Sequence, residues 1–362
     1  NVNVFFDEID FIKYIINHSD DVSKKKCVVF NLARNGTGLC KKSLVPSFCD
    51  VYNLPSTGSN AYMTCLGRHK FHYNAILRKN NISAVKSWLY TKNGWLNDIE
   101  PPSNMKLIAK PTYESASRGV RNSSIFNLSS DSVNLLKELY NEFEQDIIVQ
   151  EFIPGYEVQV PIIIGEEPLA LPPVAITMNN SADLAEKIIT YELAFSEEYN
   201  FINFSSINNT LSNKLMQESI KVAKCLGMEN YGRVDFRIDY EGNYYITDIS
   251  THPYLINHSA FAFAFKKMCF SYKDIFACIM NIKELLKDLE PITIIEFKNY
   301  LVENLSNLCS KKNSNSKVIL NFKNKELYCK KCGCKLHRNG KTKTGIQKYI
   351  CSGCKLTSSE TT

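Results

Sequence analysis

The sequence predicts a mixed α/β and α+β protein followed by a small cysteine-rich module. Three observations carry this prediction: apolar and amphipathic segments alternate early in the chain, paired apolar segments separated by turn signals dominate later, and two Cys-x-x-Cys pairs lie near the end. Alternation favours α/β units, and hairpins favour antiparallel sheets. With 362 residues, 44% of them hydrophobic and 22% charged, the chain has a globular composition that excludes wholesale disorder.

The N-terminal segment is predicted to begin as a β-α-β unit. Residues 2–6 (VNVFF) and 27–32 (CVVFNL) are apolar enough for buried strands, and residues 8–17 between them have helical periodicity. Further along, a helix over 69–80 carries Lys70.

The middle of the chain predicts strands over 106–111, 147–153 and 158–165, with an amphipathic helix over 131–144. A loop rich in small residues follows the first of these strands at Pro111. The later part predicts a helix over 211–227, a hairpin of strands 233–239 and 244–250, and mostly helical structure over 259–283.

Two features of these elements indicate phosphate and metal chemistry. Lys110 ends a strand, and the loop 114–119 that follows has small residues that let backbone N–H groups approach phosphate oxygens. Asp235 and Asp248 lie on adjacent strands of one hairpin, and Arg233 shares the face of Asp235. Paired carboxylates repel each other unless a cation such as Mg²⁺ lies between them. Taken singly, these residues are better explained by an ordinary turn and by surface ion pairs, and it is their joint pattern that favours phosphate and metal chemistry.

The same residues carry a resemblance to a known family. Residues 28–290 resemble ATP-grasp ligases, and most closely the D-alanine–D-alanine ligase group. The matching segments include IAKPTYESASRGV (108–120), VQEFIPGYEVQVPIIIG (149–165), LPPVAI (171–176), GRVDFRID (232–239) and ITDISTHPYLINHSA (246–260).

The resemblance implies a three-part ATP-grasp fold with a small C-terminal zinc ribbon. The implied divisions are a preATP-grasp α/β domain at 1–67, a central subdomain at 68–148, a C-terminal subdomain with the Mg²⁺ site at 149–300, a linker at 301–326 and the ribbon at 327–357. ATP-grasp ligases of this kind are often dimers, which implies a homodimer.

The resemblance also implies a role for each matching residue. The ATP phosphates would be contacted by Lys70 and Lys110 and covered by Ser115, Ser117 and Gly119. Adenine would be held by Glu151 and the backbone of Ile153, and the ribose hydroxyls by Glu157. Two Mg²⁺ ions would be bound by Asp235, Asp248 and Ser250. Arg233 and Lys110 would be catalytic together with Ser259, which would hold the carboxylate of the second substrate.

The implied reaction is ATP-dependent joining of an amino acid to an amino acid or peptide through an acylphosphate, with release of ADP and phosphate. The chain departs from the family pattern mainly where the family contacts its amino acids, so D-alanine is not the expected substrate. The metal motif reads Asp248-Ile-Ser250 instead of Glu-x-Asn, and we expect one metal ion to bind loosely. The alternative is a degenerate ATP-grasp sensor that binds nucleotide without turnover, with its ribbon holding nucleic acid or a partner protein.

The C-terminal cysteines predict a structural zinc site. Cys329-x-x-Cys332 and Cys351-x-x-Cys354 are separated by 18 residues, and two such pairs provide four thiolates for one Zn²⁺. The segment resembles the zinc ribbons of insertion-sequence transposases. Residues 310–362 hold 13 Lys and Arg against 2 acids, a net charge of +11. Such a module suits a nucleic acid, a carrier protein or a peptide.

No apolar run approaches the length that crosses a bilayer, and no segment resembles an export signal. We therefore expect a cytoplasmic protein without membrane contact.

Overall fold

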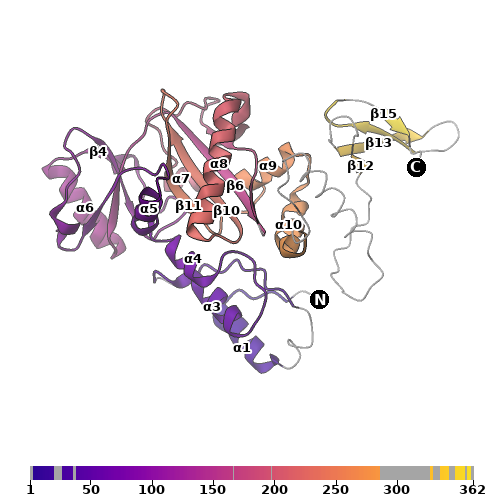
Figure 1. Ribbon diagram of the computed structural model, residues 1–362, viewed down its shortest axis with the longest axis horizontal. Helices are drawn as coiled ribbons and strands as arrows, with labels where there is room; N and C mark the ends of the chain where they lie inside the picture. Colours follow the sequence, from indigo (N-terminus) through magenta and orange to yellow (C-terminus); the bar gives the residue numbers. More distant parts are fainter. Residues whose placement is uncertain are drawn as a thin grey trace.

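The computed structural model describes residues 3–19, 27–35, 38–165, 167–196, 198–285, 327–328, 335–341, 347–354 and 357–359 (Figure 1). Three antiparallel sheets organise these residues. The predicted linker at 301–326 lies outside the described residues, and so do Cys329 and Cys332.

The N-terminal segment is helical, and its predicted strands do not form. Helix α1 (Glu8–Asn17) begins where Asp7 accepts the N–H groups of Ile9 and Asp10, as the periodicity predicted. Residues 3–6 form no strand, and residues 27–32 contribute only an isolated parallel bridge from Val29 to Ser56. The β-α-β prediction was therefore wrong. Val29 exchanges its backbone hydrogen bonds with Pro55 and Thr57, so the apolar segment pairs with the next turn of chain.

Short helices connect this segment to the first sheet. They are the 3-10 turn η1 (Lys41–Ser43) and helices α3 (Leu44–Val51), α4 (Ala61–Leu66) and α5 (Lys70–Lys79). Figure 1 shows α1, α3 and α4 grouped below the strands that form the centre of the molecule.

The first sheet has the strand order β2-β1-β5-β3-β4. Its strands are β1 (Ser87–Thr91), β2 (Gly94–Trp95), β3 (Lys106–Pro111), β4 (Ile125–Asn127) and β5 (Ile147–Glu151). Helix α6 (Ser130–Phe143) buries Leu136 and Leu139 against Leu107 and Val149 of this sheet. Strands β1 and β2 were not predicted, and β5 spans the subdomain boundary predicted between 148 and 149.

The second sheet has the strand order β11-β10-β6-β8-β9, with β7 paired to β6. Its strands are β6 (Tyr156–Ile164), β7 (Pro168–Ala170), β8 (Val174–Thr177), β9 (Asn200–Asn203), β10 (Asn230–Ile238) and β11 (Tyr244–Ser250). Helix α7 (Tyr191–Ser196) precedes β9, and further 3-10 turns lie at Leu96–Asp98, Asn122–Ser124 and Phe204–Ser206.

Alternation along β10 separates the core from the site. Val234 and Phe236 are fully buried in the cluster that includes Leu215 and Val222 of helix α8 (Asn209–Leu226). Arg233 and Asp235 therefore face the opposite side of the sheet. Farther along that side, helices α9 (Ala260–Lys267) and α10 (Tyr272–Leu285) pack in a second apolar cluster.

The cysteine-rich segment forms a four-stranded antiparallel sheet in the order β12-β13-β14-β15. Its strands are Leu327–Tyr328, Lys335–Lys341, Gln347–Cys351 and Thr357–Ser359. None of the helices in the described part of the chain combines the length and apolar character needed to cross a membrane.

Candidate functional site

The β10–β11 hairpin brings the predicted metal ligands together. Asp235 lies directly opposite Asp248 in the strand register, and Arg233 lies opposite Ser250. Directly opposed residues of an antiparallel pair project from the same face, so the expected pairing of the two carboxylates is confirmed.

Asp235 is engaged by Arg233 in a two-pronged ion pair. Arg233 Nε donates to Oδ1 at 2.6 Å, and Nη2 donates to Oδ2 at 2.7 Å. Burial raises the pKa of Asp235 to about 6, although Arg233 opposes the shift, and nearby Asp248 raises it further. Arg233 therefore supplies the positive charge that stabilises this buried carboxylate.

Asp248 is oriented by a tyrosine that the sequence reasoning missed. The buried hydroxyl of Tyr73 donates to Asp248 Oδ1 at 2.7 Å, and the N–H of Ile249 donates to the same oxygen at 3.0 Å. Oδ2 has no such contact among the described residues. Tyr73 lies three residues after Lys70 on α5, and this spacing places both on one helix face.

Lys70 and Lys110 both interact electrostatically with Asp248. Burial lowers the pKa of Lys110 on β3, while Asp248 opposes the shift and Lys70 adds to it. Lys70 donates from Nζ to the carbonyl oxygen of Glu114 at 2.5 Å. This hydrogen bond links the first residue of α5 to the loop that follows β3.

That loop, residues 114–119, has an unusual backbone. Ala116 and Ser117 both have φ of +56°, and Gly119 has φ of +80°. A Cβ atom at Gly119 would lie 2.6 Å from Pro111 Cγ, so only glycine fits there. Successive backbone N–H groups in turn conformations can form concavities that bind anions. Strained loops of this kind concentrate at functional sites.

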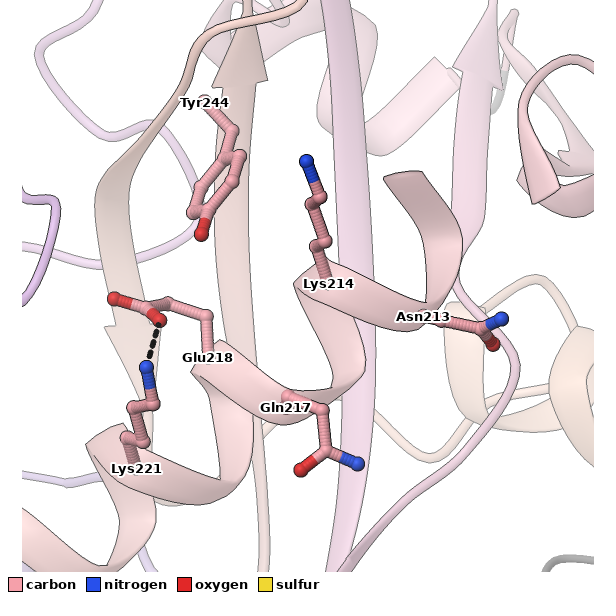
Figure 2. A pocket seen from close by; sticks show the side chains of 6 residues that line it. All are labelled: Asn213, Lys214, Gln217, Glu218, Lys221 and Tyr244. Carbon is pink, nitrogen blue, oxygen red and sulfur yellow. Dashed lines mark hydrogen bonds and ion pairs between the residues drawn. The ribbon is translucent and has the colours of Figure 1, made fainter. Parts of the chain in front are cut away.

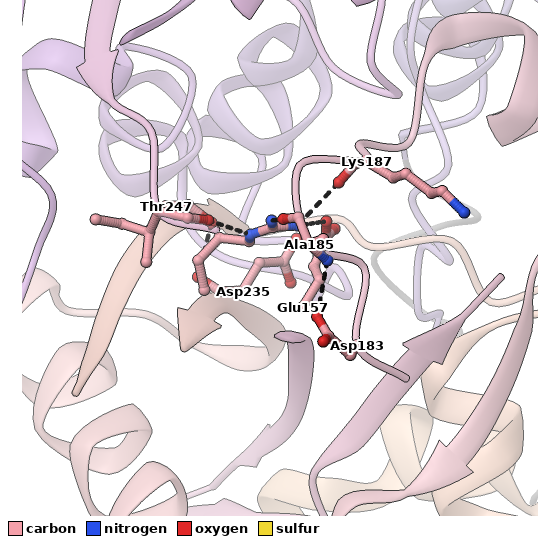
Figure 3. Close-up of polar contacts among 8 residues, drawn as sticks. Glu157, Asp183, Ala185, Lys187, Asp235 and Thr247 are labelled. Carbon is pink, nitrogen blue, oxygen red and sulfur yellow. Dashed lines mark hydrogen bonds and ion pairs between the residues drawn. The ribbon is translucent and has the colours of Figure 1, made fainter. Parts of the chain in front are cut away.

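The predicted nucleotide hinge is held by Arg237, a second residue that the sequence reasoning missed. Arg237 Nε donates to the carbonyl oxygen of Ile153 at 2.8 Å, and Nη1 pairs with Glu157 Oε2 at 3.4 Å. Its Nη1 and Nη2 groups also donate to the carbonyl oxygens of Lys187 and Ala185, two residues that are labelled in Figure 3. Arg237 follows Asp235 by two residues on β10, and residues two apart on a strand share a face. The sequence spacing could therefore have placed Arg237 on the same face as Asp235.

Two other predicted residues have structural partners. The Glu151 carboxylate lies 3.5 Å from Lys86 Nζ. Ser259 begins α9, where its hydroxyl accepts the N–H of Ala262 and donates to the carbonyl oxygen of Ile256 at 2.6 Å. The Ser259 hydroxyl therefore acts as the N-cap of α9. Ser259 does not line the cleft beside Arg233 and Asp248.

A polar cleft lies beside Arg233 and Asp248. It is lined by residues that include Arg34, Lys42, Lys70, Glu114, Arg233 and Asp248. A second hollow, on the surface of α8, is lined by Asn213, Lys214, Gln217, Glu218, Lys221 and Tyr244 (Figure 2). Glu218 and Lys221 form an ion pair there, and Lys214 is the other charged residue of the lining.

Half of the predicted zinc site lies within the described residues. Cys351 is buried at the end of β14, and the N–H of Cys354 donates to Cys351 Sγ at 3.4 Å. The described residues contain no group of three or more His, Cys, Asp or Glu arranged to hold a metal ion.

Comparisons with known proteins agree with this geometry. The family model described as "D-ala D-ala ligase C-terminus" matches residues 77–281. The chain belongs to this family. The match contains β3, the loop 114–119, the hinge and the β10–β11 hairpin.

Relatives of this D-alanine–D-alanine ligase family member cover most of its length. D-alanine–D-alanine ligase from Aquifex aeolicus is 24% identical over 241 residues, covering 66% of this chain and 76% of the relative. The Bacillus anthracis D-alanine–D-alanine ligase structure with ATP aligns with a TM-score of 0.61 at 18% identity, covering 78% and 85% of the two chains. VanG D-Ala:D-Ser ligase from Enterococcus faecalis aligns with a TM-score of 0.57 at 19% identity, covering 71% and 72%. The fold is therefore the ATP-grasp fold of an ATP-dependent ligase family.

Proposed function

We propose that this protein is an ATP-dependent carboxylate–amine ligase that forms an amide bond through an acylphosphate, joining an amino acid to an amino acid or peptide. The observation that carries the proposal is the convergence of Arg233, Asp235 and Asp248 on one hairpin. Lys70 and Lys110 both interact electrostatically with Asp248. Positive groups flanking paired carboxylates suit transfer of a phosphoryl group.

The nucleotide would lie between the two sheets. Lys70 and Lys110 would contact its phosphates, and Ser115, Ser117 and Gly119 would cover them. Glu151 and the backbone of Ile153 would hold adenine. The Ile153 carbonyl oxygen accepts a hydrogen bond from Arg237, which holds this part of the backbone in place. Glu157, oriented by Arg237, would accept the ribose hydroxyls.

The donor set fits Mg²⁺ at one position. Asp235 and Asp248 offer carboxylate oxygens side by side, and Tyr73 holds Asp248 so that Oδ2 stays available. Ser250 adds only a hydroxyl, a weaker ligand, so a second ion would be held more loosely. When bound, Mg²⁺ would neutralise charge on the phosphates.

The chain's own residues account for the rest of the reaction. A substrate carboxylate oxygen attacks the γ-phosphorus, and the bond to ADP breaks. An amine then attacks the acyl carbon, phosphate leaves with the former carboxylate oxygen, and the amine loses a proton. Lys110 would stabilise charge in the first step and Arg233 the oxyanion in the second. Ser259 would hold the second substrate's carboxylate only by giving up its bond to Ile256.

The C-terminal sheet is proposed to be a zinc ribbon with Cys329, Cys332, Cys351 and Cys354 as ligands. The N–H to Sγ contact between Cys354 and Cys351 supports this, because such contacts stabilise thiolates. The ribbon would dock a peptide, a carrier protein or nucleic acid. The reaction is proposed to take place in the cytoplasm, where ATP is supplied. A homodimer remains a prediction.

One observation favours the alternative of a nucleotide sensor. Both oxygens of Asp235 are engaged by Arg233, and Ser250 is a poor ligand. A sensor would bind ATP without turnover. Phosphate release from ATP and Mg²⁺, measured with pools of amino acids and peptides, separates the two functions. Release that needs both a carboxylate and an amine supports the ligase, and binding without release supports the sensor.

A further inference from the structure

A group of cations lines the cleft wall built by the N-terminal segments. We call Arg34, Lys42 and Arg68 the N-terminal cation cluster. Lys42 is 8% exposed and Arg68 is 6% exposed, so two of the three charges are nearly removed from water. All three line the cleft that contains Arg233 and Asp248.

The partners of the cluster are neutral. Arg34 donates to the carbonyl oxygen of His252 at 3.1 Å and lies 4.3 Å over the Tyr254 ring. Lys42 donates to Ser115 Oγ at 3.1 Å. Arg68 donates from Nε to the carbonyl oxygen of Leu39 at 2.9 Å, and its buried Nη1 has no hydrogen-bond partner.

Glu114 partly offsets the charge of Arg68, and no acid among the described residues offsets that of Lys42. Burial lowers the pKa of Lys42 to about 7, and the further causes are the cations Arg34, Arg68, Lys70 and Lys41. Glu114, the acid that lines this cleft beside them, already pairs with Arg118 at 3.5 Å and with Gln145 at 3.2 Å. Buried cations without an anion are destabilising. An anionic ligand would remove that cost.

ATP does not account for the whole cluster. Lys70 and Lys110 are the lysines that interact electrostatically with Asp248, and in the proposed function the loop 114–119 covers the phosphates. Arg34 instead contacts the segment after β11, at His252 and Tyr254, beyond the paired carboxylates. The positive charge of the cluster thus extends beyond the proposed phosphate site, toward His252 and Tyr254. A second ligand could bind in that part of the cleft.

Resting on the proposed function, we infer that the substrate whose carboxylate is activated carries a second anionic group, which the N-terminal cation cluster binds. The ligand class is an acidic amino acid or a peptide with an acidic end, and the second anion is a carboxylate or a phosphate. Charge complementarity of this kind sets specificity more than raw affinity.

Calorimetric titration of the full chain tests this inference. The probes are glutamate against glutamine and O-phosphoserine against serine, each as both enantiomers, with Mg²⁺ and a non-hydrolysable ATP analogue. An anionic probe should bind at least about tenfold tighter than its neutral counterpart. Lys42→Gln and Arg34→Gln should each weaken that binding about fivefold or more, without changing affinity for the neutral probe or the analogue. Lys214→Gln on exposed α8 is the control and should change nothing.

Equal binding of anionic and neutral probes would overturn the inference. So would a Lys42→Gln effect confined to the affinity for the ATP analogue, because the lysine would then serve the nucleotide. Preference for phosphoserine over glutamate would support the inference and assign the second anion as phosphate. Failure to bind the analogue at all would instead contradict the proposed function, and titration of the acidic probes without nucleotide would still test the cluster.

Discussion

Arg233 and Asp235 form a partly buried two-pronged ion pair between residues two positions apart on one strand, with N–O distances of 2.6 and 2.7 Å. The pair lies beside Asp248, which Tyr73 orients from helix α5. The guanidinium is therefore fixed within the group of carboxylates that we propose to bind metal. A fixed positive charge at this position is available to an oxyanion without reorganisation.

Replacement of Arg233 by alanine should abolish amide formation and leave ATP binding intact. Loss of one donor to a developing oxyanion typically lowers kcat by about 10²–10³-fold. Rates of amide formation and the affinity for the ATP analogue would be measured together. Arg121→Ala, which breaks an exposed pair with Glu142, is the control and should have little effect. Full ligation by Arg233→Ala would remove the assigned role.

The metal site should respond in opposite directions to two substitutions. Ser250→Asn introduces an amide carbonyl, a better Mg²⁺ ligand than a hydroxyl, and should lower the Mg²⁺ concentration required severalfold. Asp248→Asn keeps an oxygen that can accept the Tyr73 hydroxyl but removes a negative charge. It should therefore raise the Mg²⁺ concentration required. Thermal stability with the ATP analogue, titrated with Mg²⁺, gives the readout. If both variants behaved like the wild type, Asp248 and Ser250 would not be ligands.

The hinge glycine should be intolerant of a side chain. Gly155 has φ of +115°, and a Cβ there would lie 2.2 Å from the carbonyl oxygen of Ile238. Gly242, with φ of +82° and open space around it, is the matched control. Urea unfolding should show a loss of about 1–2 kcal/mol for Gly242→Ala from backbone strain alone. Gly155→Ala should lose more, about 3 kcal/mol or above, because the backbone must also shift. Equal losses of stability in the two variants would argue against a close approach of Gly155 to the Ile238 carbonyl oxygen.

Affinity for glutamate should rise as the pH falls from about 8 to 6, by up to about tenfold. The pKa of Lys42 is lowered to about 7, so its ammonium form becomes populated over this interval while the probe's carboxylates stay ionised. The cations Arg34, Arg68, Lys70 and Lys41 add to the lowering of the Lys42 pKa, and no acid contributes to the shift. Calorimetry at several pH values should show the slope in the wild type and a flat profile in Lys42→Gln. The same slope in both proteins would exclude Lys42 as its source.

The purified full chain should contain about one zinc ion bound by four cysteines. Cys351→Ser or Cys354→Ser should lose it, whereas Cys225→Ser on α8 should retain it. Elemental analysis of each protein after dialysis gives the stoichiometry. Metal-free protein after growth with added zinc would contradict the ribbon.

Much of the fold could be predicted because hydrophobic periodicity is local. The strands around Lys110 and Asp235 and the helices α5, α6 and α8 all form close to the expected residues. The strands predicted over 2–6 and 27–32 do not form, although the local sequence gives no reason to exclude them. Val29 pairs with the turn at Ser56, a tertiary choice that composition does not encode.

The site was predicted in part for a similar reason. Asp235 and Asp248 followed from hairpin register, which sequence spacing sets directly. Tyr73 and Arg237 act across element boundaries, on Asp248 and on Ile153, and only tertiary packing brings them there. The N-terminal cation cluster comes from three separate segments, so no single motif could reveal it.

The most direct test of the central claim is phosphate release from ATP and Mg²⁺, measured with pools of amino acids and peptides while products are followed by mass spectrometry. The account predicts release that requires both a carboxylate and an amine, with phosphate and amide formed in equal amounts. ATP binding without release or amide formation in any pool would contradict it and leave the nucleotide sensor as the function.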